Sequence, residues 1–244
     1  EDLAYEKGIE KRCGEAGVAL KKLVFAGDVT EDTLVRAVHG INGDPSINGA
    51  ILLLPFPAHI DGEATRRALL PEKDMDGITD GSLAGVFAGV SRGYAPCTAQ
   101  ACLSMLAYYG VHCTGKRAVV IGRSLVVGRP AAMLLLHRNA TVTICHTRTE
   151  NLPAIAREAD ILLVAAGRPG VIGQDCFRPG QIVIDVGVHV GPDGALCGDV
   201  RLDEAEPIVE AVTPVPGGVG AVTTAVLVSH VIEAAERASN TPAV

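Results

Sequence analysis

A glycine turn that could bind an anion lies at residues 119–130, which read VVIGRSLVVGRP. An apolar stretch runs into a turn bounded by Gly122 and Gly128, and a helical pattern follows. Such a turn suits an anion, because free N–H groups and the helix dipole converge at a helix N-terminus. The middle glycine of most dinucleotide-binding loops is absent. Tight packing of a strand against a helix explains the two glycines equally well, so both interpretations stay open for this motif alone.

Polar residues at the end of the next apolar segment bear on the choice of ligand. That segment ends in CHTRT, residues 145–149. In a dinucleotide fold the adenosine ribose lies at this point, and an acidic residue binds its 2′-hydroxyl when the cofactor is NAD. This chain offers Thr147 and Arg148 instead, and Arg123 follows the first glycine. Hydroxyl and guanidinium donors suit a 2′-phosphate, so the sequence favours NADP over NAD.

The elements that must position these residues alternate along the second half of the chain. Apolar segments typical of buried parallel strands are separated by helical patterns, which predicts an α/β fold with a doubly wound, Rossmann-type parallel sheet. The expected strands are residues 117–122, 140–146, 160–167 and 181–188, and the expected helices are residues 98–110, 128–139, 152–159 and 223–238.

The first half of the chain predicts a second α/β domain. We expect helices near residues 3–16 (with Gly17 as a stop), 30–44 (with Thr30 as N-cap) and 61–70, and strands at residues 21–26 and 47–57. The segment PEKDMDG, residues 71–77, is expected to be a loop. The predicted domains are residues 1–95 plus 222–244, with the last helix packing back on the first domain, and residues 96–221.

Composition limits the classes of protein and partner. Hydrophobic residues make up 48% of the chain and the net charge is −7, so nucleic acid and anionic membrane surfaces are not expected partners. No apolar run is long enough to span a bilayer, and the first residues do not resemble a signal peptide. The seven cysteines are scattered and lack metal-ligand spacing. We therefore expect a cytoplasmic protein without a metal, whose cysteines are all buried apolar residues.

Six segments, read together, carry a family resemblance: GRSLVVGRP, PEKDMDG, PCTAQACLSML, NATVTICHTRT, VIDVGV and TPVPGGVGAVT. In this order they resemble the bifunctional methylenetetrahydrofolate dehydrogenase/methenyltetrahydrofolate cyclohydrolase (FolD-like) family over nearly the whole chain. The resemblance implies NADP-dependent oxidation of 5,10-methylenetetrahydrofolate to the methenyl form, and hydrolysis of that product to 10-formyltetrahydrofolate. It also implies a homodimer that serves one-carbon metabolism and purine biosynthesis, with a folate-binding first domain and an NADP-binding second domain.

The resemblance also implies roles for particular residues. Tyr5 and Asp76 match substrate-binding and catalytic positions, and Asp76 would hold the amino-pyrimidinone edge of the pterin. The substrate cleft would further include Pro216, Gly217 and Gly218, and the cofactor would contact Gly122, Arg123, Ser124, Val127, Gly128, Thr147 and Arg148. Two other interpretations stay open: Asp76 caps its own loop, or PVPGG, residues 214–218, is a plain connection between domains.

Two positions depart from the family pattern in a way that bears on chemistry. Where the family carries Tyr-x-x-x-Lys, this chain has Tyr5 followed by Ile9, and Leu53 stands where a glutamine is usual. Asp2 likewise replaces a serine. Hydride removal from a carbon between two nitrogens leaves a delocalised cation and needs mainly placement. Hydrolysis needs a positioned acid or base. We therefore expect the dehydrogenase step to be retained and the cyclohydrolase step to be weak or absent.

Two alternatives follow from the same departures. A catalytically impaired relative would bind folate or NADP without hydride transfer, and a more apolar pocket would suit another one-carbon pterin. Among the histidines, only His146 lies beside a predicted ligand. No partner is predicted for five others: His59, His112, His137, His189 and His230.

Overall fold

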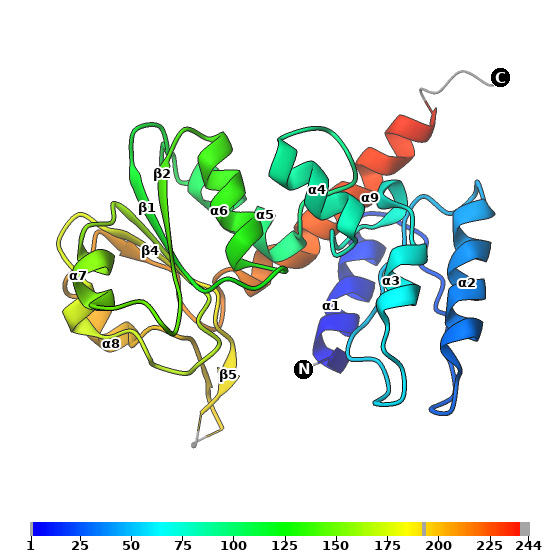
Figure 1. Ribbon diagram of the computed structural model, residues 1–244, viewed down its shortest axis with the longest axis horizontal. Coiled ribbons are helices and arrows are strands. Elements are labelled where there is room, and N and C mark those ends of the chain that lie inside the picture. The colour runs from blue at the N-terminus through cyan, green and yellow to red at the C-terminus, as the bar shows by residue number, and fades with distance from the viewer. Residues whose placement is uncertain (1, 192–193, 240–244) are drawn as a thin grey trace. The chain divides into compact units, whose positions relative to one another are not determined.

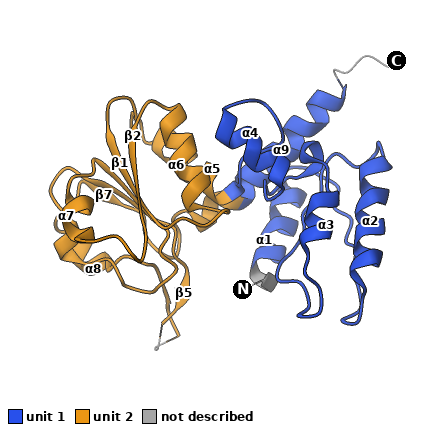
Figure 2. Cartoon of the chain, in the orientation of Figure 1, with its two compact units in different colours: residues 1–97, 224–244 blue, residues 98–223 orange. Residues whose placement is uncertain are grey.

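The computed structural model describes residues 2–191 and 194–239, and the chain divides into two compact units (Figure 2). Unit 1 is drawn from residues 1–97 and 224–244, and unit 2 consists of residues 98–223. Helices α5 (Cys97–Tyr108) and α9 (Gly220–Ser239) each contain one of the two positions at which the chain passes between the units.

Unit 2 contains a five-stranded sheet in the order β2-β1-β3-β4-β7, in which every neighbouring pair is parallel. Figure 1 shows α5 and α6 on one side of this sheet and α7 and α8 on the other. The predicted α/β class with a doubly wound parallel sheet is confirmed. Its elements are β1 (Arg117–Ile121), α6 (Gly128–His137), β2 (Thr141–Cys145), α7 (Leu152–Arg157), β3 (Ile161–Val164), η2 (Gln174–Cys176), β4 (Ile182–Asp185), α8 (Leu202–Ala205) and β7 (Ala211–Val212).

Alternate residues of the central strands form one core layer of unit 2. Leu162 and Val164 of β3 have no exposed surface, and they pack with Val119 and Ile121 of β1. The layer also receives the small residue Ala156 of α7 and others from the loops after β3. Strands that are covered on both faces are apolar at nearly every position, and for this reason β1 and β3 could be predicted from their apolar runs.

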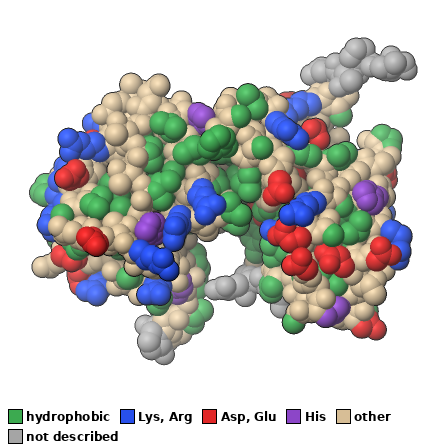
Figure 3. All heavy atoms as spheres, viewed as in Figure 1, with side chains coloured by type: hydrophobic (Ala, Val, Ile, Leu, Met, Phe, Trp, Pro, Cys, Tyr) green, Lys and Arg blue, Asp and Glu red, His purple; other side chains and the backbone are tan. Residues whose placement is uncertain are grey.

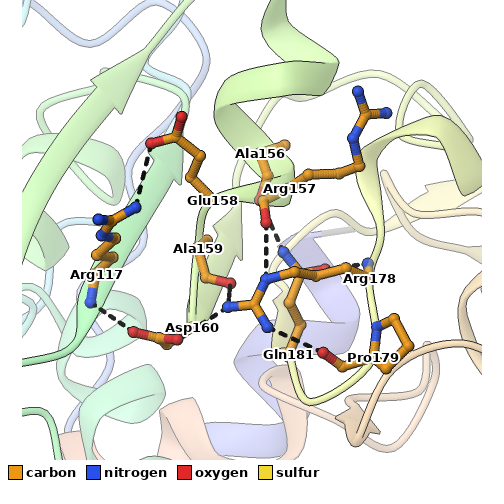
Figure 4. A network of polar contacts seen from close by, with 9 residues as sticks. All are labelled: Arg117, Ala156, Arg157, Glu158, Ala159, Asp160, Arg178, Pro179 and Gln181. Atoms are coloured by element: carbon orange, nitrogen blue, oxygen red, sulfur yellow. Dashed lines mark hydrogen bonds and ion pairs between the residues drawn. The ribbon is translucent and has the colours of Figure 1, made fainter.

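A polar network ties together the amino ends of three strands (Figure 4). The Asp160 carboxylate, just before β3, accepts from the Arg117 backbone N–H at 2.9 Å and from the Arg178 guanidinium at 2.9 Å. Arg178 also donates to the carbonyls of Arg157 (2.8 Å) and Ala159 (2.9 Å). The side chain of Gln181, just before β4, donates to the Ala156 carbonyl at 2.7 Å. These bonds fix the edge of the sheet opposite the glycine turn.

Unit 1 is built from helices and irregular segments. Leu34 and Val38 of α2 are buried, and the Thr30 side chain accepts from the Thr33 N–H, as predicted for an N-cap. Gly17, with φ of +70°, follows the first helix. The helices that lie wholly in this unit are α1 (Asp2–Glu15), α2 (Glu31–Gly43), α3 (Glu63–Ala68), η1 (Pro71–Lys73) and α4 (Asp80–Ala88).

The two strands predicted for unit 1 are wrong. Residues 18–26 form no strand, and the Val24 side chain is 88% exposed. In residues 47–57 the backbone makes a single parallel bridge, from Ala50 to Asp74, while Leu53 and Leu54 are exposed. An apolar segment becomes a strand only where a partner strand supplies a ladder of hydrogen bonds, and the part of unit 1 that the structure describes supplies only this one bridge.

Three further features were not predicted from the sequence. Helix α4 begins at an N-cap, Thr79, and ends at Gly89, whose φ of +68° suits a C-cap. A short hairpin joins β5 (His189–Val190) to β6 (Leu196–Cys197). Six cysteines are buried and all seven are free, but Cys197 is partly exposed, so the prediction of seven buried cysteines is wrong at that position. Across the described residues, no helix combines the length and apolar character needed to cross a bilayer.

The network in Figure 4 predicts a measurable contribution to stability. We expect Arg178→Gln to lower the free energy of unfolding by about 2 kcal/mol, because three backbone carbonyls and one carboxylate lose a charged donor. Glu158→Gln is the matched control, since its 3.5 Å pair with Arg117 is exposed and worth about 0.5 kcal/mol or less. Urea unfolding of both variants tests this, and equal effects would contradict the assignment.

Candidate active site

A cluster of polar side chains in unit 1 contains the two predicted catalytic residues. Tyr5 lies on α1, and Asp76 lies in the loop that follows η1. The Tyr5 hydroxyl, the Asp76 carboxylate and the thiol of Cys97, the first residue of α5, lie close enough together that Asp76 raises the pKa of both other groups. The structure therefore brings Tyr5 and Asp76 together from distant parts of the sequence. It adds Cys97, which the sequence analysis interpreted only as a buried apolar residue.

The surroundings of Asp76 favour its neutral form. Burial raises the pKa of its carboxyl, hydrogen bonds from Cys97 and Tyr5 lower it, and the nearby charge of Asp74 raises it; the net result is a pKa of about 6. Burial and the Asp76 charge raise the pKa of Tyr5 well above its ordinary value, so the phenol is a hydrogen-bond donor and not a base at neutral pH. Asp76 keeps part of its surface exposed, as a ligand-binding carboxylate must.

The loop that carries Asp76 is held by a second, fully buried aspartate. Asp74 is 1% exposed, and its carboxylate accepts from the N–H groups of Ile78 (3.2 Å) and Thr79 (2.8 Å) and from the Ser82 hydroxyl (2.7 Å). Gly77 has a φ of +69°, and a Cβ there would lie 2.5 Å from the Pro96 nitrogen. The two aspartates of KDMDG thus have different roles: Asp74 fixes the loop, and Asp76 belongs to the cluster with Tyr5 and Cys97.

His230 of α9 lies beside Cys97 and Met75 of the cluster, although no partner was predicted for it. Its Nδ1 lies 2.9 Å from the Met75 carbonyl, and the Cys97 thiol donates to the same carbonyl at 3.2 Å. The carbonyl can only accept, so Nδ1 carries a proton. Burial lowers the pKa of His230, which keeps the ring neutral, and the ring lies 4.8 Å from that of Tyr94. His230 therefore has a structural role beside the site.

The position of Ile9 bears on the proposed loss of hydrolysis. Its side chain is 4% exposed and lies on α1, one turn after Tyr5. Lys7 and Lys11 of the same helix are exposed, and Lys22 pairs with Glu6 and Glu10 at the surface. The Lys73 ammonium donates to the carbonyls of Ile41 and Asp44. Within the described residues, no cation is among the groups that shift the pKa of Asp76.

In unit 2 the glycine turn is closely packed. Gly122 has a φ of +122°, and a Cβ on it would lie 2.1 Å from the Ala165 carbonyl oxygen at the end of β3. A Cβ on Gly128 would lie 2.2 Å from the Gly122 oxygen. Backbone packing therefore requires both glycines. This is the tight-packing interpretation that the sequence left open beside anion binding. A ligand role is compatible with this packing but does not follow from it.

The first N–H groups of α6 are already hydrogen-bonded within the turn. The Ser124 hydroxyl accepts from the N–H groups of Val127 (3.1 Å) and Gly128 (3.4 Å), and the Ser124 carbonyl accepts from Arg129 (3.1 Å). Pro130 has no N–H, and Ala131 donates to Val127. The side chain that was predicted to touch the cofactor thus caps the helix. A phosphate at this point would have to displace that hydroxyl.

The carboxyl ends of β1 and β2 lie side by side, because Ile121 is in register with Cys145 and Gly122 donates to the Cys145 carbonyl at 2.9 Å. This places the residues after β1, among them Arg123 and Ser124, at the same edge of the sheet as Thr147 and Arg148. All four are exposed. The turn after β2 is ordered locally, since His146 accepts from the Arg148 N–H at 3.1 Å through Nδ1.

The segment PVPGG follows β7 at the far end of the same sheet edge. Gly217 has a φ of +99°, and a Cβ there would meet no atom within 4 Å. A Cβ on Gly218 would lie 2.4 Å from the Pro214 oxygen. The backbone at Gly217 is therefore open to close approach, while Gly218 is fixed by its own turn. Pro216, Gly217 and Gly218 all belong to unit 2.

Two buried aspartates that the sequence analysis did not single out fix the loops after β3 and β4. The carboxylate of Asp199, with no exposed surface, accepts from the consecutive N–H groups of Ala166 (2.6 Å), Gly167 (2.9 Å) and Arg168 (2.8 Å), and lies 2.7 Å from His189 Nε2. Asp185 accepts from Gly187, Asp199 and Val200. Aspartates beside glycines in VIDVGV and CGDV were the available signal. His189, like His230, thus has a partner that was not predicted.

Comparison with known proteins agrees with this architecture. Residues 96–239 match the model of the tetrahydrofolate dehydrogenase/cyclohydrolase NAD(P)-binding domain, and residues 1–76 match that of the catalytic domain of the same family. The chain therefore belongs to the tetrahydrofolate dehydrogenase/cyclohydrolase family, an α/β enzyme class with an NAD(P)-binding domain.

Individual relatives are similar over almost the whole chain. The bifunctional protein FolD of Carboxydothermus hydrogenoformans is 48% identical over 238 residues, which are 97% of this chain and 83% of that protein. The crystal structure of the FolD methylenetetrahydrofolate dehydrogenase/cyclohydrolase of Campylobacter jejuni matches with a TM-score of 0.92 at 35% identity, over 97% of this chain and 84% of that one. The Trypanosoma brucei enzyme, solved with NADP cofactor and an inhibitor, matches with a TM-score of 0.91 at 33% identity, over 98% and 84%.

The raised pKa of Asp76 predicts a pH-dependent effect on stability. Because the carboxyl binds its proton more tightly in the folded state (pKa about 6) than its ordinary value of 3.8 implies, ionised Asp76 costs stability. That cost is absent below about pH 4 and complete above about pH 6. We expect Asp76→Asn to raise the free energy of unfolding at pH 8 by about 1–2 kcal/mol, and to change it little at pH 4.

Denaturant unfolding at both pH values measures the effect, with Asp61→Asn, at an exposed position of the same unit, as the matched control. A variant that is destabilised at pH 8 would show that ionised Asp76 is stabilised by its neighbours, and would contradict the environment described for it.

Proposed function

We propose that this protein oxidises 5,10-methylenetetrahydrofolate to 5,10-methenyltetrahydrofolate with NADP as the hydride acceptor. The observation that carries the proposal is the Tyr5–Asp76–Cys97 cluster in a chain of this family. Asp76 would accept hydrogen bonds from the amino-pyrimidinone edge of the pterin, and the Tyr5 phenol would donate to it or to the substrate. A cationic product gains from an ionised carboxylate nearby, which Asp76 supplies above a pH of about 6.

The oxidation makes modest demands on the protein's own residues. The hydride leaves a carbon that is bonded to two nitrogens, and the resulting cation is delocalised, so no proton has to leave with it. Bound NADP supplies the hydride acceptor. Binding the pterin and the nicotinamide at reacting distance is then the main contribution of the chain. Pro216, Gly217 and Gly218 are proposed to line the substrate site, and the open backbone at Gly217 supports close approach of a flat ring.

NADP is proposed to bind at the carboxyl edge of the sheet of unit 2. The NADP complex of the Trypanosoma brucei relative supports this choice of cofactor, as does the family's NAD(P)-binding domain. Thr147 and Arg148 after β2, with Arg123 after β1, offer donors to a 2′-phosphate. Gly122, Ser124, Val127 and Gly128 would form the floor of the site.

We further propose that methenyltetrahydrofolate hydrolysis is weak or absent in this protein. Activating water and opening a tetrahedral intermediate both require a group that exchanges protons near neutral pH. Ile9 cannot do this, the pKa of Tyr5 is raised far from that range, and Asp76, whose pKa is about 6, is assigned to the pterin in this proposal. No other lysine is proposed to take this role, because Lys22 pairs with Glu6 at the surface and Lys73 donates to two backbone carbonyls. Leu53, which replaces the usual glutamine, is proposed to belong to the same change.

The competing proposal is a binding protein without hydride transfer, and one assay separates the two. Purified protein is given methylenetetrahydrofolate and NADP, and NADPH formation and the absorbance of the methenyl product are followed together. The proposal predicts NADPH formation and a methenyl decay no faster than in buffer. NADPH binding without turnover would favour the impaired relative, and accelerated decay would contradict the loss of hydrolysis. The homodimer and the cytoplasmic location stay predictions; light scattering measures the first.

Restoring a lysine tests the proposed role of Ile9 directly. We expect Ile9→Lys, alone or with Leu53→Gln, to accelerate methenyl hydrolysis by on the order of a hundredfold, the usual scale for one acid/base group. Ile9→Met is the matched control, since it keeps an apolar side chain at this buried position. Because a buried lysine lowers stability, thermal unfolding is measured alongside. Folded variants that show no acceleration would overturn the explanation.

A further inference from the structure

Arg168 lies close to the point at which the strand order of the unit 2 sheet reverses. Strand β2 pairs with one edge of β1, and the chain then crosses over so that β3 pairs with the other edge of β1. In open α/β sheets, ligands bind at the carboxyl ends of the strands at this switch point. Arg168 follows the end of β3 by four residues, directly across the switch point from the turn after β1, and Gly122 of that turn packs on the backbone of Ala165.

The arginines of unit 2 fall into two groups by their contacts. Five have guanidinium groups that bond to other residues of the unit: Arg117, Arg138, Arg157, Arg178 and Arg201. For the other four the described residues provide no such side-chain partner, and all four follow the carboxyl ends of β1, β2 or β3: Arg123, Arg129, Arg148 and Arg168. Figure 3 shows Lys and Arg side chains gathered on the viewed face of unit 2. Uncompensated cations at one sheet edge favour a polyanion.

Although Arg168 is exposed, its backbone is held by hydrogen bonds to a buried carboxylate. Its N–H, with those of Ala166 and Gly167, donates to the fully buried carboxylate of Asp199. Asp199 is itself fixed, because its own N–H donates to Asp185. The guanidinium end of Arg168 is exposed, while its main chain cannot move without breaking charge-assisted bonds. Such an anchored cation loses less freedom on binding a ligand than one on a mobile loop.

We propose that Arg168 is a cofactor-binding residue that contacts the pyrophosphate of NADP from the β3 side. The inference rests on the proposed cofactor. The adenosine ribose belongs at the end of β2, where Arg148 lies, and the pyrophosphate belongs at the end of β1. Arg168 is on the opposite side of β1 from Arg148, so it reaches the pyrophosphate and not the 2′-phosphate. Its role is therefore affinity for either nicotinamide nucleotide, whereas Arg148 discriminates between them.

Titration of the purified variants with NADPH and with NADH, followed by nucleotide fluorescence without folate present, tests this. Arg168→Gln is expected to raise the Kd for both nucleotides by the same factor of about ten, the effect of losing one charged donor. Arg148→Gln is expected to raise the Kd for NADPH much more than that for NADH. Arg117→Gln, which removes the same charge from the opposite edge of the sheet, is the matched control and should leave both values unchanged.

An unchanged Kd in Arg168→Gln would overturn the inference, and so would a loss confined to NADPH, which would place Arg168 at the 2′-phosphate. Equal losses in Arg168→Gln and Arg117→Gln would show only a general effect of charge and would overturn it as well. If the unmodified protein binds neither nucleotide, the proposed cofactor fails, and that result is distinct from a variant that binds as tightly as the unmodified protein.

Discussion

Buried carboxylates that accept backbone N–H groups hold the two loops that carry Asp76 and Arg168. In unit 1, Asp74 holds the turn that presents Asp76. In unit 2, Asp185 and Asp199 hold the loops after β4 and β3. A buried carboxyl group is costly unless its oxygens are hydrogen-bonded, so these loops have little freedom to rearrange. The rigidity of the proposed sites thus depends on residues that would touch no ligand themselves.

The cluster around Asp76 shows how two neighbouring acids acquire different tasks. Asp74 is enclosed by donors, whereas Asp76 has only a phenol and a thiol as partners and keeps some exposed surface. The absence of a described cation beside Asp76 leaves burial as the main influence on its pKa. Above a pH of about 6, a site of this kind is suited to binding a cationic product, which agrees with the dehydrogenase activity proposed above.

Sequence patterns predicted unit 2 better than unit 1, for a physical reason. Strands such as β1 and β3 are covered on both faces and paired on both sides, so an apolar run of four or five residues suffices to identify them. Residues 21–26 and 47–57 carry the same pattern, but whether a run becomes a strand depends on a neighbour that the run itself does not encode. Helix α4 was missed because its capping signals, Thr79 and Gly89, flank a short segment that contains two glycines and has no clear apolar periodicity.

For the sites, family resemblance located Tyr5 and Asp76, but their contacts with Cys97 and His230 come from the fold alone. Helix α9 lies far along the sequence from Met75, and no local pattern indicates that His230 bonds its carbonyl.

The capped start of α6 has a consequence for how the nucleotide would be held. Because the Ser124 side chain already uses the amide donors there, a bound phosphate gains little from the helix and depends on exposed guanidinium groups. Attraction between exposed charges is screened over roughly 10 Å at moderate ionic strength. Nucleotide retention by this protein should therefore weaken steeply as salt is added, unlike that of a loop whose backbone amides grip the phosphate directly.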